Sequence, residues 1–258
     1  MCTVVLNHEG DGRLWVAANR DEVLVRPATP PRRWPGEGFV APRDEVGGGS
    51  WLGLTSRGLF VAVTNRFGAP KDEARQSRGL LVLEALRQPS AAAVHASLAQ
   101  LPTERFNAFH LLYSDGVDGF LTWHDGARIH QQPLARGLNV VTERSFQPRL
   151  ALAGSEGVSG PAPTPLSGEP DRVRFIRAQL AELGSSPTPE QLQALLGIHR
   201  PEAPLDSPCV HVPDFGYGTR SSLVLFKERN VEDSDWRWAD GPPDRTPFTA
   251  HRFGALLG

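Results

Sequence analysis

The chain has 258 residues, a length that suits one large domain or two small ones. Its hydrophobic fraction of 40% and charged fraction of 22% are those of a globular protein, which excludes a disordered chain and a fibre. There are 27 Lys and Arg residues against 29 Asp and Glu residues, and the resulting formal charge of -2 argues against a general nucleic-acid-binding protein or one that binds anionic membranes.

The first third of the sequence predicts β-structure. Short apolar runs at 3–6 and 14–18 flank a turn-rich stretch, which indicates a hairpin. A Pro- and Arg-rich segment at 26–35 is interpreted as a loop. A glycine cluster follows at 47–53, and a further strand is expected at 59–64.

Helical patterns begin at Ser77. An apolar stripe follows this residue and Pro89 ends it, while Ser90 is a suitable N-cap for a second helix through Gln100. The later predicted elements are strands at 106–113, 120–124, 128–131 and 139–142, an exposed loop at 154–170, helices at 172–183 and 190–196, and a last strand at 221–227.

The order of these elements is strands, helices, strands, helices and a strand, with no internal repeat and no linker long enough to divide the chain. Such an order favours antiparallel sheets covered by segregated helices over a parallel βαβ series. We therefore expect an α+β fold, a four-layer αββα sandwich of two stacked antiparallel sheets, formed by a single domain over residues 1–258.

No apolar run approaches the roughly 18 residues of a membrane-spanning helix, and the N-terminal residues lack the basic stretch and long apolar core of a signal peptide. We therefore expect a cytoplasmic protein without a membrane span. The eight histidines show no metal-ligand spacing, and Cys209-Val210-His211 is a single pair that could chelate iron or zinc. We predict no metal site.

The position of one cysteine has chemical consequences. The chain has two cysteines, and Cys2 directly follows Met1, where a small residue normally allows the initiator methionine to be removed. The mature chain would then carry a thiol and a free α-amine on the same residue. That amine, with a reference pKa of about 7.7–8.0, can accept the thiol proton without any histidine. The alternative is that Cys2 packs as a small hydrophobic residue in a buried strand.

A polar run follows the second predicted strand and would lie within reach of Cys2 through the hairpin. It consists of Asn19, Arg20, Asp21 and Glu22. An arginine favours the thiolate form of a cysteine, and a carboxylate can orient an α-amine or α-ammonium group. The alternative interpretation is a solvated strand end with a turn.

Three further residues stand at predicted strand edges. The side-chain amides of Asn65 and Asn139 could donate to a developing oxyanion, although each is more often a turn or strand-edge residue. Arg220, at the start of the last strand, could bind a carboxylate or orient the cysteine, and an ordinary strand-entry arginine is an equal alternative.

Several motifs together resemble the NRDE family, also called the Transport and Golgi Organization 2 family. They occur in the family's order and extend to about residue 228, so the resemblance covers most of the chain. The motifs are Met1-Cys2-Thr3, Ala18-Asn19-Arg20-Asp21-Glu22, Gly48-Gly49-Ser50-Trp51-Leu52-Gly53, Thr64-Asn65, Arg78-Gly79, Phe106-Asn107-Ala108-Phe109 and Tyr217-Gly218-Thr219-Arg220.

The resemblance implies an N-terminal-nucleophile hydrolase fold related to the choloylglycine hydrolase and penicillin V acylase group. It implies that Cys2 is the nucleophile and supplies the amine base, and that Asp21 holds the amine. Asn65 and Asn139 become candidates for the oxyanion- and amine-binding asparagines, and Arg220 for a late arginine beside the thiol. We predict that substrate is bound by Asn19, Glu22, Trp51 and Tyr217.

The chain departs from the acylase pattern at one position. The acylases place their early arginine three residues before the aspartate, whereas Arg20 immediately precedes Asp21, and Ala18 occupies the acylases' arginine position. We interpret this shift as a move of the arginine to the other face of the strand. We therefore expect Arg20 to point away from the thiol.

Two functions follow from these patterns. The first is an amidohydrolase in which the Cys2 thiolate attacks a linear amide, with no cofactor. The alternative is a non-catalytic carrier of haem, lipid or acyl-CoA, because the resemblance also implies haem trafficking and because Trp51, Phe60, Phe106 and Phe109 could line an apolar cleft. An inactive relic of a hydrolase is a third possibility. The expected partner is a small-molecule amide or apolar ligand, and the oligomeric state is left open.

Overall fold

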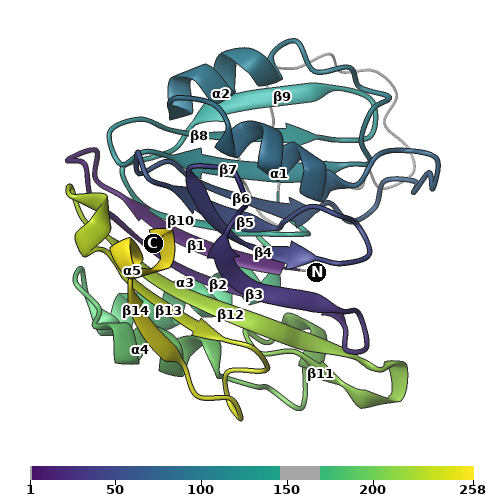
Figure 1. Cartoon of the computed structure of the whole chain (residues 1–258). Helices are drawn as coiled ribbons and strands as arrows, with labels where there is room; N and C mark the ends of the chain where they lie inside the picture. The colour runs from purple at the N-terminus through teal and green to yellow at the C-terminus, as the bar shows by residue number, and fades with distance from the viewer. Residues whose placement is uncertain (1, 146–168) are drawn as a thin grey trace.

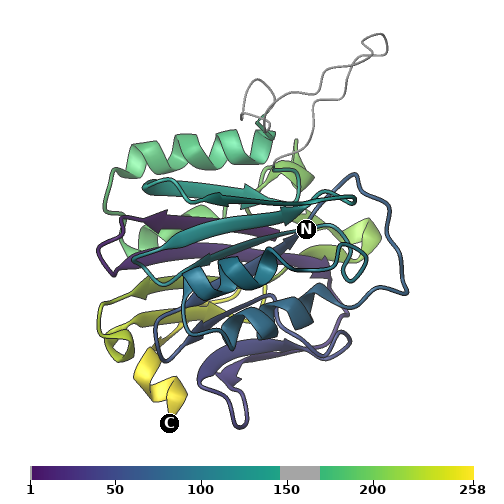
Figure 2. The ribbon, with the colours of Figure 1, turned by 90° about the horizontal axis from the view of Figure 1, so that it is seen from above.

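The computed structural model describes residues 2–145 and 169–258, and these form two stacked antiparallel sheets with helices on the outer faces (Figures 1 and 2). In sheet A the strand order is β10-β1-β2-β12-β13-β14, with β11 paired to one end of β12. Its strands are β1 Cys2–His8, β2 Leu14–Val23, β10 Gly137–Thr142, β11 His211–Val212, β12 Tyr217–Lys227, β13 Asp235–Ala239 and β14 Thr249–Arg252.

Sheet B is a meander in which strands adjacent in sequence are also adjacent in space, in the order β3-β4-β5-β6-β7-β8-β9. Its strands are β3 Ala28–Arg33, β4 Phe39–Asp44, β5 Leu52–Thr55, β6 Phe60–Asn65, β7 Phe109–Ser114, β8 Gly119–His124 and β9 Ile129–Pro133. The helices are α1 Arg78–Leu86, α2 Ala91–Leu98, α3 Asp171–Leu183, α4 Pro189–Leu196 and α5 Phe253–Leu257, and three short 3-10 turns are η1 Pro204–Asp206, η2 Pro213–Phe215 and η3 Val231–Asp233.

The helices cover the two sheets from opposite sides. α1 and α2 pack on β5–β8 of sheet B, whereas α3 and α4 pack on β10, β2 and β12 of sheet A. This is the αββα arrangement that the order of elements predicts, and the fold class is confirmed. Among the described residues, no helix is both long enough and apolar enough to cross a bilayer.

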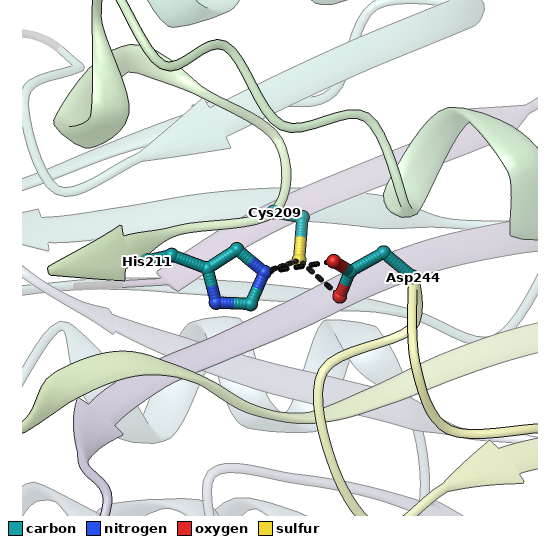
Figure 3. Close-up of side chains that lie close together, drawn as sticks. All are labelled: Cys209, His211 and Asp244. Carbon is teal, nitrogen blue, oxygen red and sulfur yellow. Dashed lines mark hydrogen bonds and ion pairs between the residues drawn. The ribbon is translucent and has the colours of Figure 1, made fainter. Parts of the chain in front are cut away.

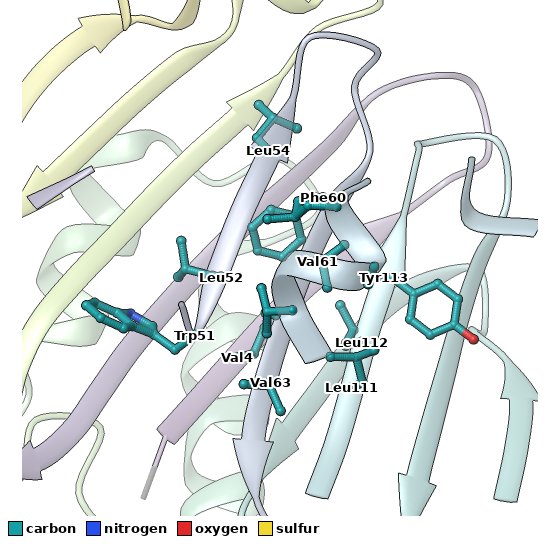
Figure 4. Packing of buried hydrophobic residues seen from close by; sticks show 14 of the residues in the cluster. Val4, Trp51, Leu52, Leu54, Phe60, Val61, Val63, Leu111, Leu112 and Tyr113 are labelled. Atoms are coloured by element: carbon teal, nitrogen blue, oxygen red, sulfur yellow. The ribbon is translucent and has the colours of Figure 1, made fainter. Parts of the chain in front are cut away.

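The core between the sheets is made by alternate residues of each strand. On β1, Val4 and Leu6 face sheet B and pack in the same cluster as Leu52 and Phe60 (Figure 4), while Val5 faces the opposite way and packs with α3 and α4. β1 is therefore buried on both faces, which explains why its sequence is a continuous apolar run rather than an alternating one.

The helix boundaries follow the caps that the sequence predicts. The side chain of Ser77 accepts a hydrogen bond from the Gly79 N–H at the start of α1, and that of Ser90 accepts one from the Ala93 N–H at the start of α2. Each cap satisfies one of the backbone donors that a helix start leaves without a partner. The predicted helices at 172–183 and 190–196 begin one residue earlier in the structure, and the predicted loop at 154–170 lies almost entirely outside the described residues.

The prediction of a loop at 26–35 is wrong, because the segment contains the edge strand β3 of sheet B. The two prolines of β3, Pro30 and Pro31, lie where the register with β4 shifts, between Thr29 and Arg32. Proline lacks an N–H and is tolerated at sheet edges and bulges. A composition typical of loops is therefore compatible with a strand at this position.

Two glycines of the quoted motifs are explained by a close contact between α1 and the loop before β5. A Cβ atom on Gly49 would lie 2.2 Å from the carbonyl carbon of Gly79, and one on Gly79 would lie 3.0 Å from the Ser50 nitrogen. The Ser50 N–H donates to the Gly79 carbonyl oxygen at 3.1 Å. Only glycine allows two backbones to approach this closely, and the contact fixes Trp51 directly beside β1.

Candidate active site around Cys2

Cys2 is the first residue of β1 and lies, half-buried, at a small cavity between the two sheets. The cavity volume is about 10 Å³, which is room for about one water molecule. Polar groups of Arg20 and Ser221 and the rings of Trp51 and Trp238 contribute to its wall. The thiol thus faces a narrow site with both polar and aromatic surfaces.

Arg20 points toward the thiol, which corrects the expectation that it points away. Cys2 and Arg20 are directly opposite in the β1–β2 register, so their side chains share one face of sheet A. The Arg20 guanidinium is 4.1 Å from the ring centroid of Trp51 and donates to Asp44 at 3.1 Å. Its Nη1 atom is buried and has no hydrogen-bond partner among the described residues. Ala18 lines the same cavity, because positions two residues apart on a strand share a face, and a shift of the arginine from position 18 to position 20 therefore keeps it on the side of the thiol.

Asp21 points to the opposite face of sheet A and is buried there. Its carboxylate accepts hydrogen bonds from Arg172 at 2.9 Å and from the hydroxyl of Thr219 at 2.7 Å, and its backbone oxygen accepts one from Tyr217 at 2.9 Å. Tyr217 is therefore joined to the predicted site. Burial raises the pKa of its phenol, and the charges of Asp21 and Cys2 add to that shift.

A second carboxylate completes a buried group that we call the Arg172 cluster: Arg172, Asp21 and Glu143. Glu143 lies 3.8 Å from the Arg172 guanidinium, which also donates to the hydroxyl of Thr3 at 3.1 Å. The Arg172 side chain is 2% exposed and that of Glu143 is 4% exposed. Two buried carboxylates thus share the guanidinium of Arg172.

The backbone register places Glu143 beside the start of β1. Thr142 is the last residue of β10 and pairs with Thr3, so Glu143 follows at the level of Cys2. Burial raises the pKa of Glu143, the Arg172 charge lowers it, and the Asp21 charge raises it further. Its Oε2 atom is buried without a hydrogen-bond partner among the described residues.

Burial also raises the pKa of the Cys2 thiol, and the negative charges of Asp21 and Glu22 add to this effect, whereas the Arg20 charge opposes it. The thiol is consequently protonated at neutral pH. Nucleophilic chemistry at this sulfur would need a base close by.

The remaining residues of the polar run have different surroundings. The Asn19 amide donates to the carbonyls of Leu196 and Pro208 at 3.0 and 2.8 Å, and its oxygen accepts from Ser222 at 2.6 Å. The polar groups of this buried side chain are engaged within the protein, where Asn19 joins β2 to the loops after α4, and its part in substrate binding stays a prediction. Glu22 lies 3.9 Å from Arg20 on the cavity face.

Asn65 ends β6 with an exposed side chain. Side chains alternate along a strand, so Asn65 shares a face with Val63, which lines the Cys2 cavity. The structure thus puts the Asn65 amide on the side of β6 that faces β1. Its role in an oxyanion hole remains a prediction.

The structure places Asn139 away from Cys2, and its predicted role in binding the oxyanion or the amine stays untested. Asn139 pairs with Leu6, four residues along β1 from Cys2, which is about 13 Å at 3.3 Å per residue. Its amide donates to the carbonyls of Ala135 and Gly137 in its own turn. The residue that reaches the level of Cys2 is Glu143, at the other end of β10.

Arg220 occupies a bulge in β12, where the register with β2 shifts between Thr219 and Ser221. Its guanidinium donates to Asp240 at 3.0 Å. The neighbouring Ser221, opposite Arg20, is the residue that lines the cavity. The part in catalysis that the resemblance implies for Arg220 stays a prediction.

Three residues near the thiol are absent from the predicted site: Arg78, Glu143 and Arg172. Arg78 starts α1 and donates to the Ala108 carbonyl at 2.9 Å, and burial lowers its pKa while the charges of Cys2 and Glu22 oppose that shift. The Arg78-Gly79 motif is a signal for it. The sequence signal for Arg172 is weaker. Arg172 precedes Ile176 by four residues, so the two share a helix face and a charged residue lies on the apolar stripe of α3.

Solved structures of similar fold define the class of the protein. A variant of conjugated bile acid hydrolase from Clostridium perfringens has a TM-score of 0.61 and 12% identity, with coverage of 100% of this chain and 94% of that one. A Caenorhabditis elegans orthologue of N-acylethanolamine-hydrolyzing acid amidase has a TM-score of 0.58 and 13% identity, with coverage of 90% of this chain and 94% of that one. Penicillin V acylase from Agrobacterium tumefaciens has a TM-score of 0.55 and 17% identity, with coverage of 93% of this chain and 83% of that one. The fold is that of the N-terminal-nucleophile hydrolases.

The sequence then places the chain in a family. The model of the family Transport and Golgi organisation 2 matches residues 1–234, so the chain belongs to this family. A Transport and Golgi organization protein 2 homolog from Bos taurus is 27% identical, with coverage of 93% of this chain and 92% of that protein. The homolog from Homo sapiens is 29% identical, with coverage of 86% and 88%.

Proposed function

We propose that the protein is an N-terminal-cysteine amidohydrolase acting on linear amides. The observation that carries the proposal is the placement of Cys2 between a cavity lined by Arg20 on one face of sheet A and the Arg172 cluster on the other. Removal of Met1 would create an α-ammonium group on Cys2. That charge would lie beside the two carboxylates of the cluster, and Glu143 Oε2 is a buried acceptor without a hydrogen-bond partner among the described residues.

The chemistry uses the amine as the acid and base. The neutral α-amine takes the thiol proton, and the thiolate attacks the amide carbonyl to form a C–S bond and an oxyanion. Arg20 Nη1 and the Asn65 amide are the donors proposed to stabilise that oxyanion. The ammonium then returns its proton to the leaving nitrogen as the C–N bond breaks. Water, deprotonated by the same amine, hydrolyses the remaining thioester and releases the acid.

The names of the structural neighbours support an acylated amine as the substrate class, because they include a conjugated bile acid hydrolase, an N-acylethanolamine-hydrolyzing acid amidase and Penicillin V acylase. The aromatic wall made by Trp51 and Trp238, with ring centroids 6.1 Å apart, would contact the apolar acyl group. Glu22, on the same face as Arg20, would bind a polar part of the substrate, as would Tyr217.

Intact mass spectrometry of the purified protein tests the first requirement. We expect a mass lacking Met1, and we expect a thiol-directed acylating reagent to add one acyl group, mapped to Cys2 by peptide analysis. The half-buried Cys2 is accessible, whereas the side chain of Cys209 is buried and serves as an internal control. Retention of Met1, or modification of Cys209 with Cys2 untouched, would contradict the mechanism.

Glu143→Gln tests the proposed partner of the amine. A nearby carboxylate raises the pKa of an ammonium group, so we expect the acidic limb of the pH profile of kcat/KM to shift to lower pH by about one unit. We also expect the plateau to fall about tenfold, because the amine loses its orientation. Penicillin V, a conjugated bile acid and an N-acylethanolamine form the substrate panel.

The control for this variant is Glu9→Gln, an exposed carboxylate after the far end of β1. It should leave both the limb and the plateau unchanged. If Glu143→Gln lowers the plateau of kcat/KM but leaves the acidic limb of the pH profile in place, Glu143 contributes only to packing and does not hold the amine.

The carrier alternative and the cytoplasmic location stay predictions. Phe60, Phe106 and Phe109 are each at most 1% exposed and belong to the core, so of the four aromatic residues predicted to line a cleft only Trp51 lines the cavity. We therefore favour the hydrolase, and binding of haem remains untested.

A further inference from the structure

A second group of reactive side chains lies apart from Cys2, at the junction of β11 with the loop after β13. It consists of Cys209, His211 and Asp244 (Figure 3). The Cys209 sulfur is 3.5 Å from His211 Nε2 and 3.4 Å from Asp244 Oδ1, and His211 Nε2 is 2.9 Å from Asp244 Oδ2. The proposed amide hydrolysis uses none of these atoms.

We propose that this group is a zinc site, with Cys209 Sγ, His211 Nε2 and one Asp244 oxygen as ligands. Zinc binds sulfur at about 2.3 Å and nitrogen or oxygen at about 2.0–2.2 Å in tetrahedral geometry, so the ligand atoms of such a site are separated by about 3.3–3.6 Å. The two distances from sulfur have these values already. The 2.9 Å nitrogen–oxygen distance is to the other carboxylate oxygen, Oδ2, so binding through a single oxygen needs a rotation of the Asp244 carboxylate. One ligand atom from each of the three residues already lies within 4.8 Å of the other two.

The backbone holds all three ligands in place without the metal. The Cys209 N–H donates to the Ile198 carbonyl oxygen at 2.9 Å, and the His199 Nδ1–H donates to the Cys209 carbonyl oxygen at 2.9 Å. His211 is fixed by its β-bridge to Gly218. On the other side, the N–H groups of residues 245 and 246 both donate to the Pro242 carbonyl, and this turn presents Asp244.

The site opens on one side. The side chain of Cys209 is buried, while those of His211 and Asp244 are 16% and 23% exposed. Asp244 also lines a surface depression together with Gly197, Ile198, Pro243 and Phe248. A cation held by the three ligands would therefore keep a fourth position for water or a small ligand, as in zinc sites with three protein ligands. The exposed Arg245 lies 3.3 Å from the Asp244 carboxylate and would have to turn outward.

A thiolate, an imidazole and a carboxylate together favour zinc or another first-row transition ion over magnesium or calcium, which prefer oxygen ligands. The site is also connected to the Cys2 region. The Val210 N–H donates to the Thr219 hydroxyl at 2.8 Å, and that hydroxyl donates to Asp21 at 2.7 Å. Metal binding at Cys209 and His211 would fix Val210, which lies between them. We therefore expect bound zinc to raise the unfolding temperature of the protein.

Metal titration of the whole protein, with Cys209→Ser and Cys2→Ser as a matched pair, tests the proposal. An N-terminal cysteine with a free amine can itself chelate a metal, and the chain has only these two cysteines, so the pair separates the two sites. We expect one equivalent of Zn²⁺ to bind to the wild type and to Cys2→Ser. We expect at least about tenfold weaker binding in Cys209→Ser.

Replacement of zinc by Co²⁺ gives a readout independent of affinity. A thiolate-to-cobalt charge-transfer band in the near ultraviolet should appear in the wild type and in Cys2→Ser, and should be lost in Cys209→Ser. His211→Gln, a change at a partly exposed side chain, should weaken binding and keep the fold, as checked by circular dichroism. A band lost in Cys2→Ser but kept in Cys209→Ser would overturn the proposal, as would the absence of stoichiometric binding in the folded wild type.

Discussion

Replacing Cys2 with serine is expected to lower kcat/KM for amide hydrolysis by at least about a thousandfold, with little effect on stability. A serine hydroxyl is far less acidic than a thiol, so the amine would generate much less of the attacking anion and the covalent step would be much slower. The change from sulfur to oxygen is small, and Cys2 is only half-buried, so we expect the unfolding temperature to stay close to that of the wild type.

The comparison requires Michaelis–Menten measurements on the same panel of amides, with removal of Met1 verified by mass for each variant. Asn7→Ser, a change at the opposite end of β1, is the control and should retain full activity. If Cys2→Ser hydrolyses an amide as fast as the wild type, the reaction does not use this sulfur and the proposed function is wrong.

Arg172→Leu is expected to destabilise the protein by about 3–5 kcal/mol, because it removes the buried guanidinium that pairs with the carboxylates of Asp21 and Glu143. For a chain of this size, each kcal/mol corresponds to about 2–4 °C in unfolding temperature, so thermal denaturation should show a decrease of about 6–20 °C. Urea denaturation should show the matching loss in the free energy of unfolding. Arg174→Leu, on the exposed side of the same helix, is the matched control and should change stability by less than about 0.5 kcal/mol.

The pH dependence distinguishes charge from packing in this variant. A carboxyl group whose folded-state pKa is raised, as that of Glu143 is, costs stability when ionised, and this cost is lost as pH falls through the folded-state pKa. The loss of Arg172 raises the pKa further. The stability difference between Arg172→Leu and the wild type should therefore shrink as the pH falls through the raised folded-state pKa of Glu143. A difference that is the same at pH 7 and pH 4 would show that lost packing of the long side chain is the cause.

Local sequence determined most of the secondary structure and the order of the layers. Ser77 and Ser90 cap the helices that they predict, because a hydroxyl beside a helix start acts over a few residues and needs no tertiary contact. The N-terminal hairpin likewise follows from two apolar runs and a turn, and it is sufficient to bring Cys2 next to the polar run at 19–22. These interactions are short in range, so the sequence by itself specifies them.

The tertiary structure alone decided which polar groups meet at Cys2. Arg20 faces the thiol because the register of β1 and β2 pairs the two residues directly, and Glu143 rather than Asn139 reaches that level because of the register of β1 and β10. Arg172 joins Asp21 across 151 residues of sequence, and Asp244 meets Cys209 across 35. A strand register fixed by pairing between distant segments has no local signal, since a shift of one residue exchanges the two faces of the sheet.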